Sequence, residues 1–481
     1  METPVIHSSG EVNHLRKKHR KWYKNWKVIT IISIGMVAAL LGGISYYQAN
    51  YFNSNKTINH INVGGLTAEQ AFEKLQTTEL KNEIYIDDQL ILDGNDTKMG
   101  MTERDLPEVK KLLKSQWTFF PTFESENYSL IPSEPDLYRS KGLKNELKKK
   151  ILSMNEELPA PTDAQVILDE GKIIVSKSVD GKEYDVTSLL TAYEEHGYSS
   201  EIYLDPIYSL PITEDSEIIK NGEKKLQELL DFTVDYNVQD HVHSLKGSDV
   251  IHHATVSKDL EVAFDPSGIQ KKVTEINDAQ STLGKDFNFT TTSGGVISVK
   301  GQGYGWALDV KKETDLIQAA FQKNETSVSA TNIIGNGWNN EGYGYETLAN
   351  NGIGNTYAEV SIAEQRIWLY RDGELVVTTN VVTGKRSTGE DTSPGVWYIL
   401  FKRTPYTLNG SSVGSGTYSI EVDYWAPFTN SGQGFHDASW RTNWNSNAYH
   451  TGGSGGCINV QPSMMKKVYD NLTVYQPVVV Y

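Results

Sequence analysis

The stretch "EVSIAEQRIWLYRDGELVVTTNVVTGK", residues 359–385, contains the clearest fold signal in the chain. Apolar and polar residues alternate along it, which is typical of strands that bury one face. The triplet Arg371-Asp372-Gly373 separates two such runs and predicts a hairpin turn. Strands continue through "GVWYILF", residues 395–401, and one short helix is expected after Pro462. We therefore expect residues 353–481 to form a mostly β domain that catalyses or binds.

This domain contains the only cysteine of the chain, in "HTGGSGGCINV", residues 450–460. A lone cysteine cannot be half of an internal disulfide, and Cys457 lies outside any CxxC spacing typical of zinc or redox sites. Free cysteines are often small buried hydrophobes. Cys457 is therefore either a packing residue or a reactive thiol.

A histidine that could activate this thiol is available in the same domain. A cysteine becomes a useful nucleophile when a neighbouring imidazole takes its proton. The domain contains two histidines, His436 and His450. The glycines around Cys457 allow a sharp turn that presents backbone N–H groups to a developing oxyanion. Together these residues suit acyl transfer through a thioester.

Length and composition indicate a globular protein with an unusual N-terminus. The chain has 481 residues, of which 38% are hydrophobic and 22% charged, enough for about three domains. Residues 1–27 carry seven basic and two acidic side chains, and residues 28–47 carry no charge. Twenty apolar residues at about 1.5 Å each span a hydrocarbon core of roughly 30 Å. We expect a transmembrane helix at 28–47 behind a basic tail at 1–27.

The alternative for this segment is a cleaved signal peptide. Such peptides have a shorter apolar stretch that ends in small residues, whereas this one ends in "SYYQANYF". The positive-inside rule places the tail in the cytoplasm and residues from about 50 onward outside the cell membrane. The whole chain has a formal net charge of −16. Because the tail contributes +5, residues 28–481 carry a net charge of −21. An acidic exterior argues against nucleic-acid binding.

An internal repeat lies between the apolar segment and the β domain. "GKIIVSKSVDGKEYDV", residues 171–186, and "GVISVKGQGYGWALDV", residues 295–310, match in pairs 124 residues apart, among them Ile173/Ile297, Val175/Val299, Gly181/Gly305, Asp185/Asp309 and Val186/Val310. Each predicts a strand, a glycine turn and an Asp-Val step into a helix. The repeat indicates two α+β modules in tandem, expected at 56–215 and 216–352.

The second module also contains two pairs of histidines. A structural zinc site usually has four ligands in matched pairs, and a catalytic site commonly keeps three. Neither pattern is complete, so we expect no metal and no cofactor. The histidines are expected to be solvated strand residues: His241, His243, His252 and His253.

The spacing of histidine and cysteine supports a family resemblance. His436, seventeen intervening residues and "SGGCIN", residues 454–459, resemble the signature of the L,D-transpeptidase family with its YkuD-type catalytic domain. Residues 359–385 and 392–399 resemble the opening strands of that domain. The upstream modules resemble the peptidoglycan-binding domains of Gram-positive members. The resemblance implies a β-sandwich catalytic domain at 353–481.

The activity implied by this resemblance is crosslinking of the cell wall. Cys457 would attack the carbonyl of the third residue of a tetrapeptide stem, release the terminal D-Ala and pass the acyl group to an amine of a neighbouring stem. No ATP, metal or organic cofactor takes part. The implied partners are stem peptides and, through residues 28–47, the membrane. Carbapenems are expected to acylate Cys457.

The resemblance also assigns roles to residues. Cys457 matches the nucleophile, His436 the base, and the backbone carbonyl of Asp437 the group that orients the imidazole. Backbone N–H groups of Gly456 and Cys457 match the oxyanion hole. Positions expected along the substrate channel are Ser454, Gly455, Asn459, Tyr418 and Trp440.

One position departs from the family pattern, and two other functions stay open. The family has histidine where this chain has Gly455, so either the pocket is wider or His450 supplies an imidazole. An L,D-carboxypeptidase would use the same acyl-enzyme and give it to water. A non-catalytic wall-binding anchor would keep the fold alone. We expect a catalytic Cys457 to be alkylated near neutral pH faster than a free thiol, which separates the enzymes from the anchor.

Overall fold

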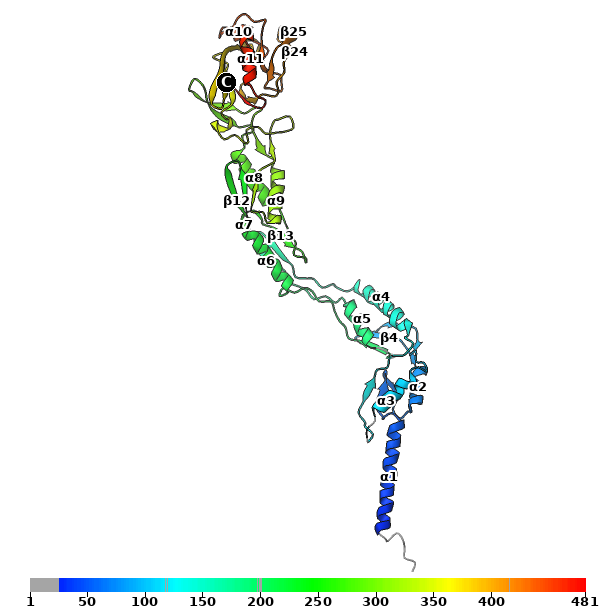
Figure 1. Ribbon diagram of the computed structural model, residues 1–481. Coiled ribbons are helices and arrows are strands. Elements are labelled where there is room, and N and C mark those ends of the chain that lie inside the picture. The colour runs from blue at the N-terminus through cyan, green and yellow to red at the C-terminus, as the bar shows by residue number, and fades with distance from the viewer. Residues whose placement is uncertain (1–25, 117, 119, 197, 199–200, 415) are drawn as a thin grey trace, which may run out of the picture. The chain divides into compact units, whose positions relative to one another are not determined.

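The chain forms two compact units. The first comprises residues up to 163 together with 178–212, and the second comprises 164–177 together with 213–481. The computed structural model describes residues 26–481 except positions 117, 119, 197, 199–200 and 415 (Figure 1). Most of the expected cytoplasmic tail, residues 1–27, therefore lies outside the described residues.

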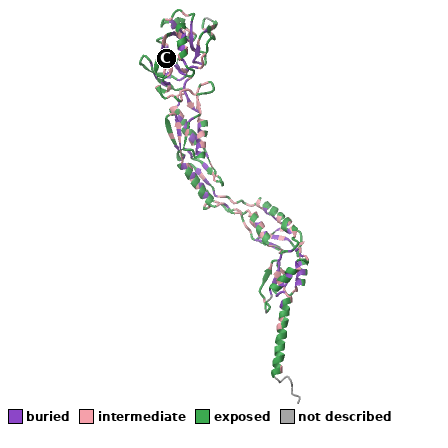
Figure 2. Cartoon of the chain, in the orientation of Figure 1, coloured by how far each residue is buried: buried purple, intermediate pink, exposed green. Residues whose placement is uncertain are grey.

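Helix α1, Trp26–Asn50, is long and apolar enough to cross a membrane. It contains the segment expected at 28–47 and extends beyond it at both ends. Its side chains are exposed along almost the whole helix (green in Figure 2). A membrane anchor and a signal sequence near the N-terminus share these properties.

The first unit contains two small hydrophobic cores, each built on a three-stranded sheet. One core joins the sheet β2-β1-β7 to helices α2 and α3. Helix α2 begins at a capping box, in which the Thr67 hydroxyl accepts from the N–H of Gln70 and the Gln70 side chain accepts from the N–H of Thr67. The elements of this core are β1 (Lys56–Ile58), β2 (Ile61–Asn62), α2 (Ala68–Thr77), β3 (Glu79–Leu80), β6 (Thr97–Lys98), α3 (Leu106–Ser115) and β7 (Glu126–Tyr128).

The other core of the first unit joins the sheet β10-β4-β5 to helices α4 and α5. Helix α5 begins at the predicted Asp-Val step, where the Asp185 carboxylate accepts from the N–H groups of Thr187 and Ser188. The elements are β4 (Glu83–Ile86), β5 (Gln89–Asp93), η2 (Tyr138–Leu143), α4 (Lys144–Asn155), α5 (Val186–Glu195) and β10 (Glu201–Leu204).

The second unit begins with an α+β module. Its core lies between helices α6, α8 and α9 and the sheets β12-β11-β18 and β14-β13-β8-β9. Asp309 caps α9 as Asp185 caps α5, with backbone angles that differ by less than about 10°. The elements are α6 (Glu217–Asp231), β11 (Thr233–Val238), β12 (His241–Lys246), α7 (Gly247–Val250), β13 (Ala254–Val256), β14 (Val262–Phe264), α8 (Ser267–Gln280), β17 (Ala307–Leu308), α9 (Val310–Lys323), β18 (Ser327–Ser329) and β19 (Ile333–Ile334).

Each repeat places its hairpin in the domain that follows. The hairpin of β8 (Val166–Asp169) and β9 (Lys172–Val175) pairs with β13 and joins the second module, although its sequence falls within the range expected for the first. The hairpin of β15 (Asp286–Thr290) and β16 (Val296–Lys300) packs in one core with strands of the β domain. In both copies of the sequence repeat, therefore, the hairpin packs with the following domain.

The mostly β fold of the C-terminal domain is confirmed. Eight strands form one sheet in the order β23-β29-β20-β21-β22-β28-β27-β26. Asp372 and Gly373, both with positive φ, make the predicted turn between β21 and β22. The elements are β20 (Tyr357–Ser361), β21 (Arg366–Arg371), β22 (Glu374–Val382), β23 (Gly395–Tyr398), β26 (Trp425–Pro427), β27 (Gly434–Asp437), α10 (Ala448–Gly452), β28 (Ile458–Val460), the predicted helix α11 (Pro462–Asn471) and β29 (Pro477–Val480).

A separate two-stranded hairpin lies beside this sheet. Its strands are β24 (Tyr406–Ser412) and β25 (Gly416–Val422), which we call the active-site hairpin because it lines the pocket described below. Gly410 lies opposite Tyr418, and a Cβ on Gly410 would come within 2.4 Å of the Tyr418 hydroxyl. The glycine lets the tyrosine ring lie across the hairpin.

Candidate active site

Two parallel strands bring the predicted histidine and the cysteine segment together. In the register of β27 and β28, His436 lies beside Asn459, and Cys457 directly precedes β28. Phe435 and Ile458, which alternate with them, are fully buried in the domain core. The alternation of side chains along both strands therefore places the polar residues on the same face.

A small cavity of about 90 Å³ lies on this face. It is lined by seven of the nine predicted site residues and by two apolar side chains of the active-site hairpin. The lining comprises His436, Cys457, Asn459, Ser454, Gly455, Tyr418, Trp440, Leu408 and Ile420. Of the predicted site residues, Asp437 and Gly456 lie outside the lining.

One nitrogen of the His436 imidazole is hydrogen-bonded to the backbone, and the other can act as a base. Nδ1 lies 2.7 Å from the backbone oxygen of Asp437, which can only accept, so Nδ1 carries the proton. The ring is 3% exposed and stacks on Trp440 at 5.8 Å between ring centres. Burial lowers the pKa of His436, so the imidazole is neutral near pH 7 and Nε2 offers a lone pair.

Asn459 and Arg441 hold the other side of the imidazole. With its oxygen toward Arg441, the Asn459 amide accepts from Nη2 and Nε at 2.8 and 3.0 Å and donates to Nε2 of His436 at 3.1 Å. Arg441 also donates to the backbone oxygen of Gly452 at 2.6 Å. Our sequence reasoning missed Arg441. Its position five residues after His436 was the available signal, but no periodicity distinguishes it from a surface arginine.

The thiol of Cys457 is protonated at neutral pH. Sγ donates to the backbone oxygen of Gly432 at 3.6 Å, and burial raises the pKa of Cys457 to about 11. At pH 7 only about one thiol in 10⁴ would then be ionised. This differs from the activated thiol that the expected fast alkylation requires, because burial disfavours the charged thiolate.

Ser454 and Gly456 shape the loop before the cysteine. The N–H of Gly456, expected to face an oxyanion, donates to the Ser454 hydroxyl at 3.2 Å, and that hydroxyl donates to the backbone oxygen of Cys457 at 2.5 Å. Gly456 has φ +114°, and a Cβ there would lie 2.6 Å from Nε2 of Gln433. Ser454 therefore stabilises the turn, and only glycine fits at position 456.

The position that departs from the family pattern is open. A Cβ on Gly455 would lie 3.8 Å from Oε1 of Glu390 and 4.0 Å from the backbone oxygen of Ser411, both ordinary contact distances. His450 lies in α10, is exposed and packs against Tyr449 at 4.2 Å. It does not line the cavity, so the structure places no second imidazole there.

A partly buried carboxylate holds the tip of the active-site hairpin in place. Oε1 of Glu390 accepts from the N–H of Val413 at 2.8 Å and from the Ser412 hydroxyl at 2.9 Å. Oε2 accepts from the Thr388 hydroxyl at 2.5 Å and lies 3.5 Å from Nζ of Lys385. These hydrogen bonds, that of Thr388 foremost, lower the pKa of Glu390 to about 2. Lys385 in turn donates its backbone N–H to Ser454, so the hairpin and the cysteine loop share one anchor.

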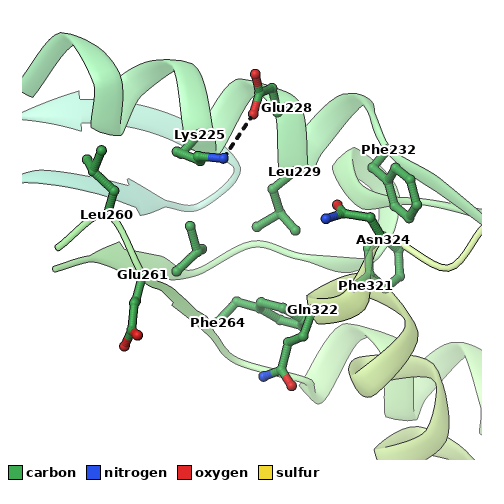
Figure 3. A pocket seen from close by; sticks show the side chains of 11 residues that line it. Lys225, Glu228, Leu229, Phe232, Leu260, Glu261, Phe264, Phe321, Gln322 and Asn324 are labelled. Carbon is green, nitrogen blue, oxygen red and sulfur yellow. Dashed lines mark ion pairs between the residues drawn. The ribbon is translucent and has the colours of Figure 1, made fainter.

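A larger cavity lies in the upstream module, far along the sequence from Cys457. It has a volume of about 470 Å³ and lies between α6, β14 and the C-terminal end of α9 (Figure 3). Leu229 and Phe264 lie between Lys225 and Glu228 on one side and Gln322 on the other, and these three polar side chains form the rim of the cavity. Within the described part of the chain, no cluster of three or more His, Cys, Asp or Glu side chains could hold a metal ion.

Comparisons with known families match two segments of the chain. The model of the L,D-transpeptidase catalytic domain, YkuD, matches residues 355–480. A model of a peptidoglycan-binding domain matches residues 217–329. No curated protein matches the chain.

Several solved structures are similar to parts of the chain. A crystal structure of a cysteine-to-serine variant of Enterococcus faecium L,D-transpeptidase is 26% identical, covers 54% of this chain and 100% of its own, and has a TM-score of 0.45. The catalytic domain from Enterococcus faecium, solved by NMR, is 36% identical over 26% of this chain and 96% of its own, with a TM-score of 0.25. Mycobacterium tuberculosis L,D-transpeptidase 3, crystallised with a faropenem-derived adduct, is 22% identical over 26% of this chain and 60% of its own, with a TM-score of 0.23.

The two matched models follow one another as the modules do in the structure. The catalytic model covers the strands that carry His436 and Cys457. The peptidoglycan-binding model covers the module from α6 to β18. The chain belongs to the L,D-transpeptidase family, with a YkuD-type catalytic domain and a peptidoglycan-binding domain upstream of it.

Proposed function

We propose that the chain crosslinks peptidoglycan stem peptides through a thioester on Cys457 and releases the terminal D-Ala of a tetrapeptide donor. The observation that carries this proposal is the shared cavity of Cys457 and His436, in which Asp437 fixes the imidazole with Nε2 as its basic atom. A nucleophile, a base and a group that orients the base are the parts that acyl transfer requires.

Proton transfer accompanies attack in this site, because both partners start neutral. Sγ of Cys457 attacks the donor carbonyl while its proton passes to Nε2 of His436. Nε2 then gives this proton to the leaving amine of D-Ala as the carbon–nitrogen bond breaks and the thioester forms. An acceptor amine next attacks the thioester, loses its proton to Nε2, and the sulfur leaves and is reprotonated.

Two side chains must move before the first step. The thiol must give up its hydrogen bond to the Gly432 carbonyl and donate to Nε2 of His436 instead. The Asn459 amide must first give up its own hydrogen bond to that Nε2. Asn459 stays attached to Arg441, so it acts as a positioning residue that can return after transfer. The Cys457 N–H completes the proposed oxyanion hole, and Gly456 contributes once its N–H leaves Ser454.

The lining of the cavity favours an amine acceptor over water. Leu408, Ile420 and the Trp440 ring surround the reacting pair with apolar surface. Such surface disfavours bulk water, which a carboxypeptidase would use. We therefore place transpeptidase activity above the L,D-carboxypeptidase and the non-catalytic anchor.

Product analysis tests this proposal. Purified chain is incubated with a disaccharide tetrapeptide, with and without an excess of an acceptor stem. We expect a crosslinked product minus D-Ala with the acceptor, and little tripeptide without it. Tripeptide as the main product in both reactions would assign the carboxypeptidase, and no product together with no acyl-enzyme would assign the anchor.

We also propose that α1 anchors the enzyme in the cell membrane, with its N-terminus in the cytoplasm and residues from about 50 onward at the wall. The basic residues before α1 and the aromatic residues at its end support this orientation. The mass of the mature protein tests it, since an uncleaved anchor retains residues 28–47 and a signal peptide loses them.

A further inference from the structure

A loop between the two matched family models displays an almost fully exposed tryptophan. The loop, residues 335–343, follows β19 and precedes the catalytic domain, and lies outside both 217–329 and 355–480. Trp338 is 94% exposed, more than any other large apolar side chain in the described part of the chain. A single exposed apolar side chain is common on protein surfaces, so the surroundings of Trp338 decide whether it marks a contact surface.

The loop is held in place by a dense set of hydrogen bonds. The N–H of Gly337 donates to the backbone oxygen of Glu341 at 2.8 Å, and the N–H of Asn340 donates back to Gly337 at 3.0 Å. The Glu341 carboxylate accepts from the N–H and the amide of Asn339 at 3.0 and 3.1 Å. Trp338 is therefore presented on a preformed turn, and a ligand that covers it loses little loop entropy on binding.

A group of tyrosine rings supports the base of this turn. The Tyr398 hydroxyl donates to the backbone oxygen of Asn336 at 3.0 Å. Tyr343 packs on Tyr398 at 4.4 Å and stacks on Tyr475 at 4.7 Å. Tyr475 is 53% exposed and has φ +69°, a strained conformation for an aromatic residue that is typical of binding sites.

The tyrosines also line a cavity next to the turn. Tyr343, Tyr475 and Glu346 contribute to a cavity of about 470 Å³. The Tyr343 hydroxyl lies 2.9 Å from where a Cβ on Gly337 would stand, so turn and cavity are neighbours. Exposed aromatic faces, amide side chains and a carboxylate thus gather in one small region.

The charges of this region restrict its ligand. Residues 324–365 contain no lysine or arginine, whereas Glu341, Glu346 and the cavity residue Asp372 are acidic. A polyanionic wall polymer or a phosphate headgroup would meet the like charge of these carboxylates. A neutral ligand with flat C–H faces and many hydroxyl and acetamido groups fits better. Its C–H groups meet the electron-rich ring faces, and its polar groups meet asparagine and glutamate side chains.

We propose that Trp338, Tyr343 and Tyr475 form a binding surface for the neutral N-acetylated sugar rings of a peptidoglycan glycan strand. This inference rests on the proposed function in taking peptidoglycan as the substrate. The surface holds the glycan, while the cavity at Cys457 takes the stem peptide. The enzyme then binds the glycan strand and the stem peptide through different residues.

The test measures glycan binding separately from acylation. Full-length protein in detergent is titrated with the β-1,4-linked tetramer and hexamer of N-acetylglucosamine, both of which are neutral. We expect Trp338→Ala to weaken binding of both at least tenfold and Trp338→Phe to retain part of it. Leu210→Ala, which removes another highly exposed apolar side chain, should bind as the wild type does.

Each outcome decides the proposal. Unchanged glycan binding by Trp338→Ala, with an unchanged melting temperature, overturns it. So does stronger binding of teichoic acid than of the N-acetylglucosamine tetramer to the wild type. Acylation of Cys457 by a carbapenem should stay equal in wild type and Trp338→Ala. A wild type that binds glycan through Trp338 but forms no acyl-enzyme would contradict the proposed function and leave the sugar surface standing.

Discussion

The cavity at Cys457 and the cavity of the upstream module differ in size and chemistry. The first has a volume of about 90 Å³ and encloses a neutral thiol and a neutral imidazole between apolar side chains. The second has about 470 Å³ and a rim of charged and amide side chains. The larger cavity contains neither the cysteine nor a histidine. The comparison teaches that the size of a cavity does not locate chemistry, whereas paired acid–base groups with shifted pKa values do.

Loss of either reacting partner should have the largest effect. Cys457→Ala and His436→Ala should each lower the rate of acylation by several orders of magnitude, because the two residues act as one unit. Intact-mass measurement after incubation with a carbapenem follows the adduct, and the melting temperature controls for folding. Substantial turnover of a tetrapeptide by Cys457→Ala would move the chemistry away from this cavity.

The pH dependence should separate the thiol from the imidazole. Since the pKa of His436 is lowered, its neutral form is present near pH 7, and acylation should fall only at more acidic pH as the imidazole is protonated. Since the pKa of Cys457 is about 11, alkylation by iodoacetamide should be slower than that of an exposed thiol at pH 7 and should rise steeply toward pH 11. Rapid alkylation at neutral pH would show that a thiolate forms before substrate binds.

Release of the active-site hairpin should lower acylation about tenfold. Glu390→Gln removes the charge that Lys385 and the hairpin tip face, so the hairpin loses its position over the pocket. Hydrogen exchange at residues 406–422 should accelerate, while Glu421→Gln, an exposed change on β25, serves as the control. The stability from Glu390 is present above its unfolded pKa of about 4.3 and is lost as pH falls toward 2.

Restoring the family's histidine should have a modest effect. Gly455→His should fold, because its Cβ meets ordinary contact distances and its φ lies outside the left-handed region. We expect acylation to change less than threefold and the free energy of unfolding by about 0.5 kcal/mol or less. Gly456→Ala is the contrasting variant, since its strained φ and contact with Gln433 should cost about 1–3 kcal/mol. Equal melting temperatures for the two variants would contradict this geometry.

The smallest effect is expected in the module cavity. Gln322→Ala changes the rim of the large cavity and should leave carbapenem acylation within twofold of the wild type. Intact-mass kinetics on the full chain measure this. A loss of tenfold or more would couple the two cavities and weaken the contrast between them.

The sequence predicted the β fold well because alternation and turn chemistry are local signals. The turn at Asp372-Gly373, the helix after Pro462 and the Asp-Val step into α5 are all present. The neighbourhood of His436 and Cys457 followed from the resemblance. These elements need only short-range information or a known motif.

The features that the sequence could not predict depend on contacts between residues far apart in the chain. The raised pKa of Cys457 depends on its burial in the folded domain, and the contact of Arg441 with Asn459 joins the segment after β27 to strand β28. We expected the Gly456 N–H to face an oxyanion. In the structure it donates instead to the Ser454 hydroxyl. The sequence repeat predicts the strands of the two hairpins. It does not predict that each hairpin packs with the domain that follows.

The hairpin Asp286–Lys300 limits how this protein could be recombined. Phe287, Phe289 and Val299 pack with Val396 and Val479, and Thr292 donates to the buried carboxylate of Glu359. A catalytic domain moved to another protein at residue 353 would leave this side of its core open to water and Glu359 without two of its donors. The transferable piece therefore begins inside the preceding module, so gene fusion or shuffling would have to carry both segments together.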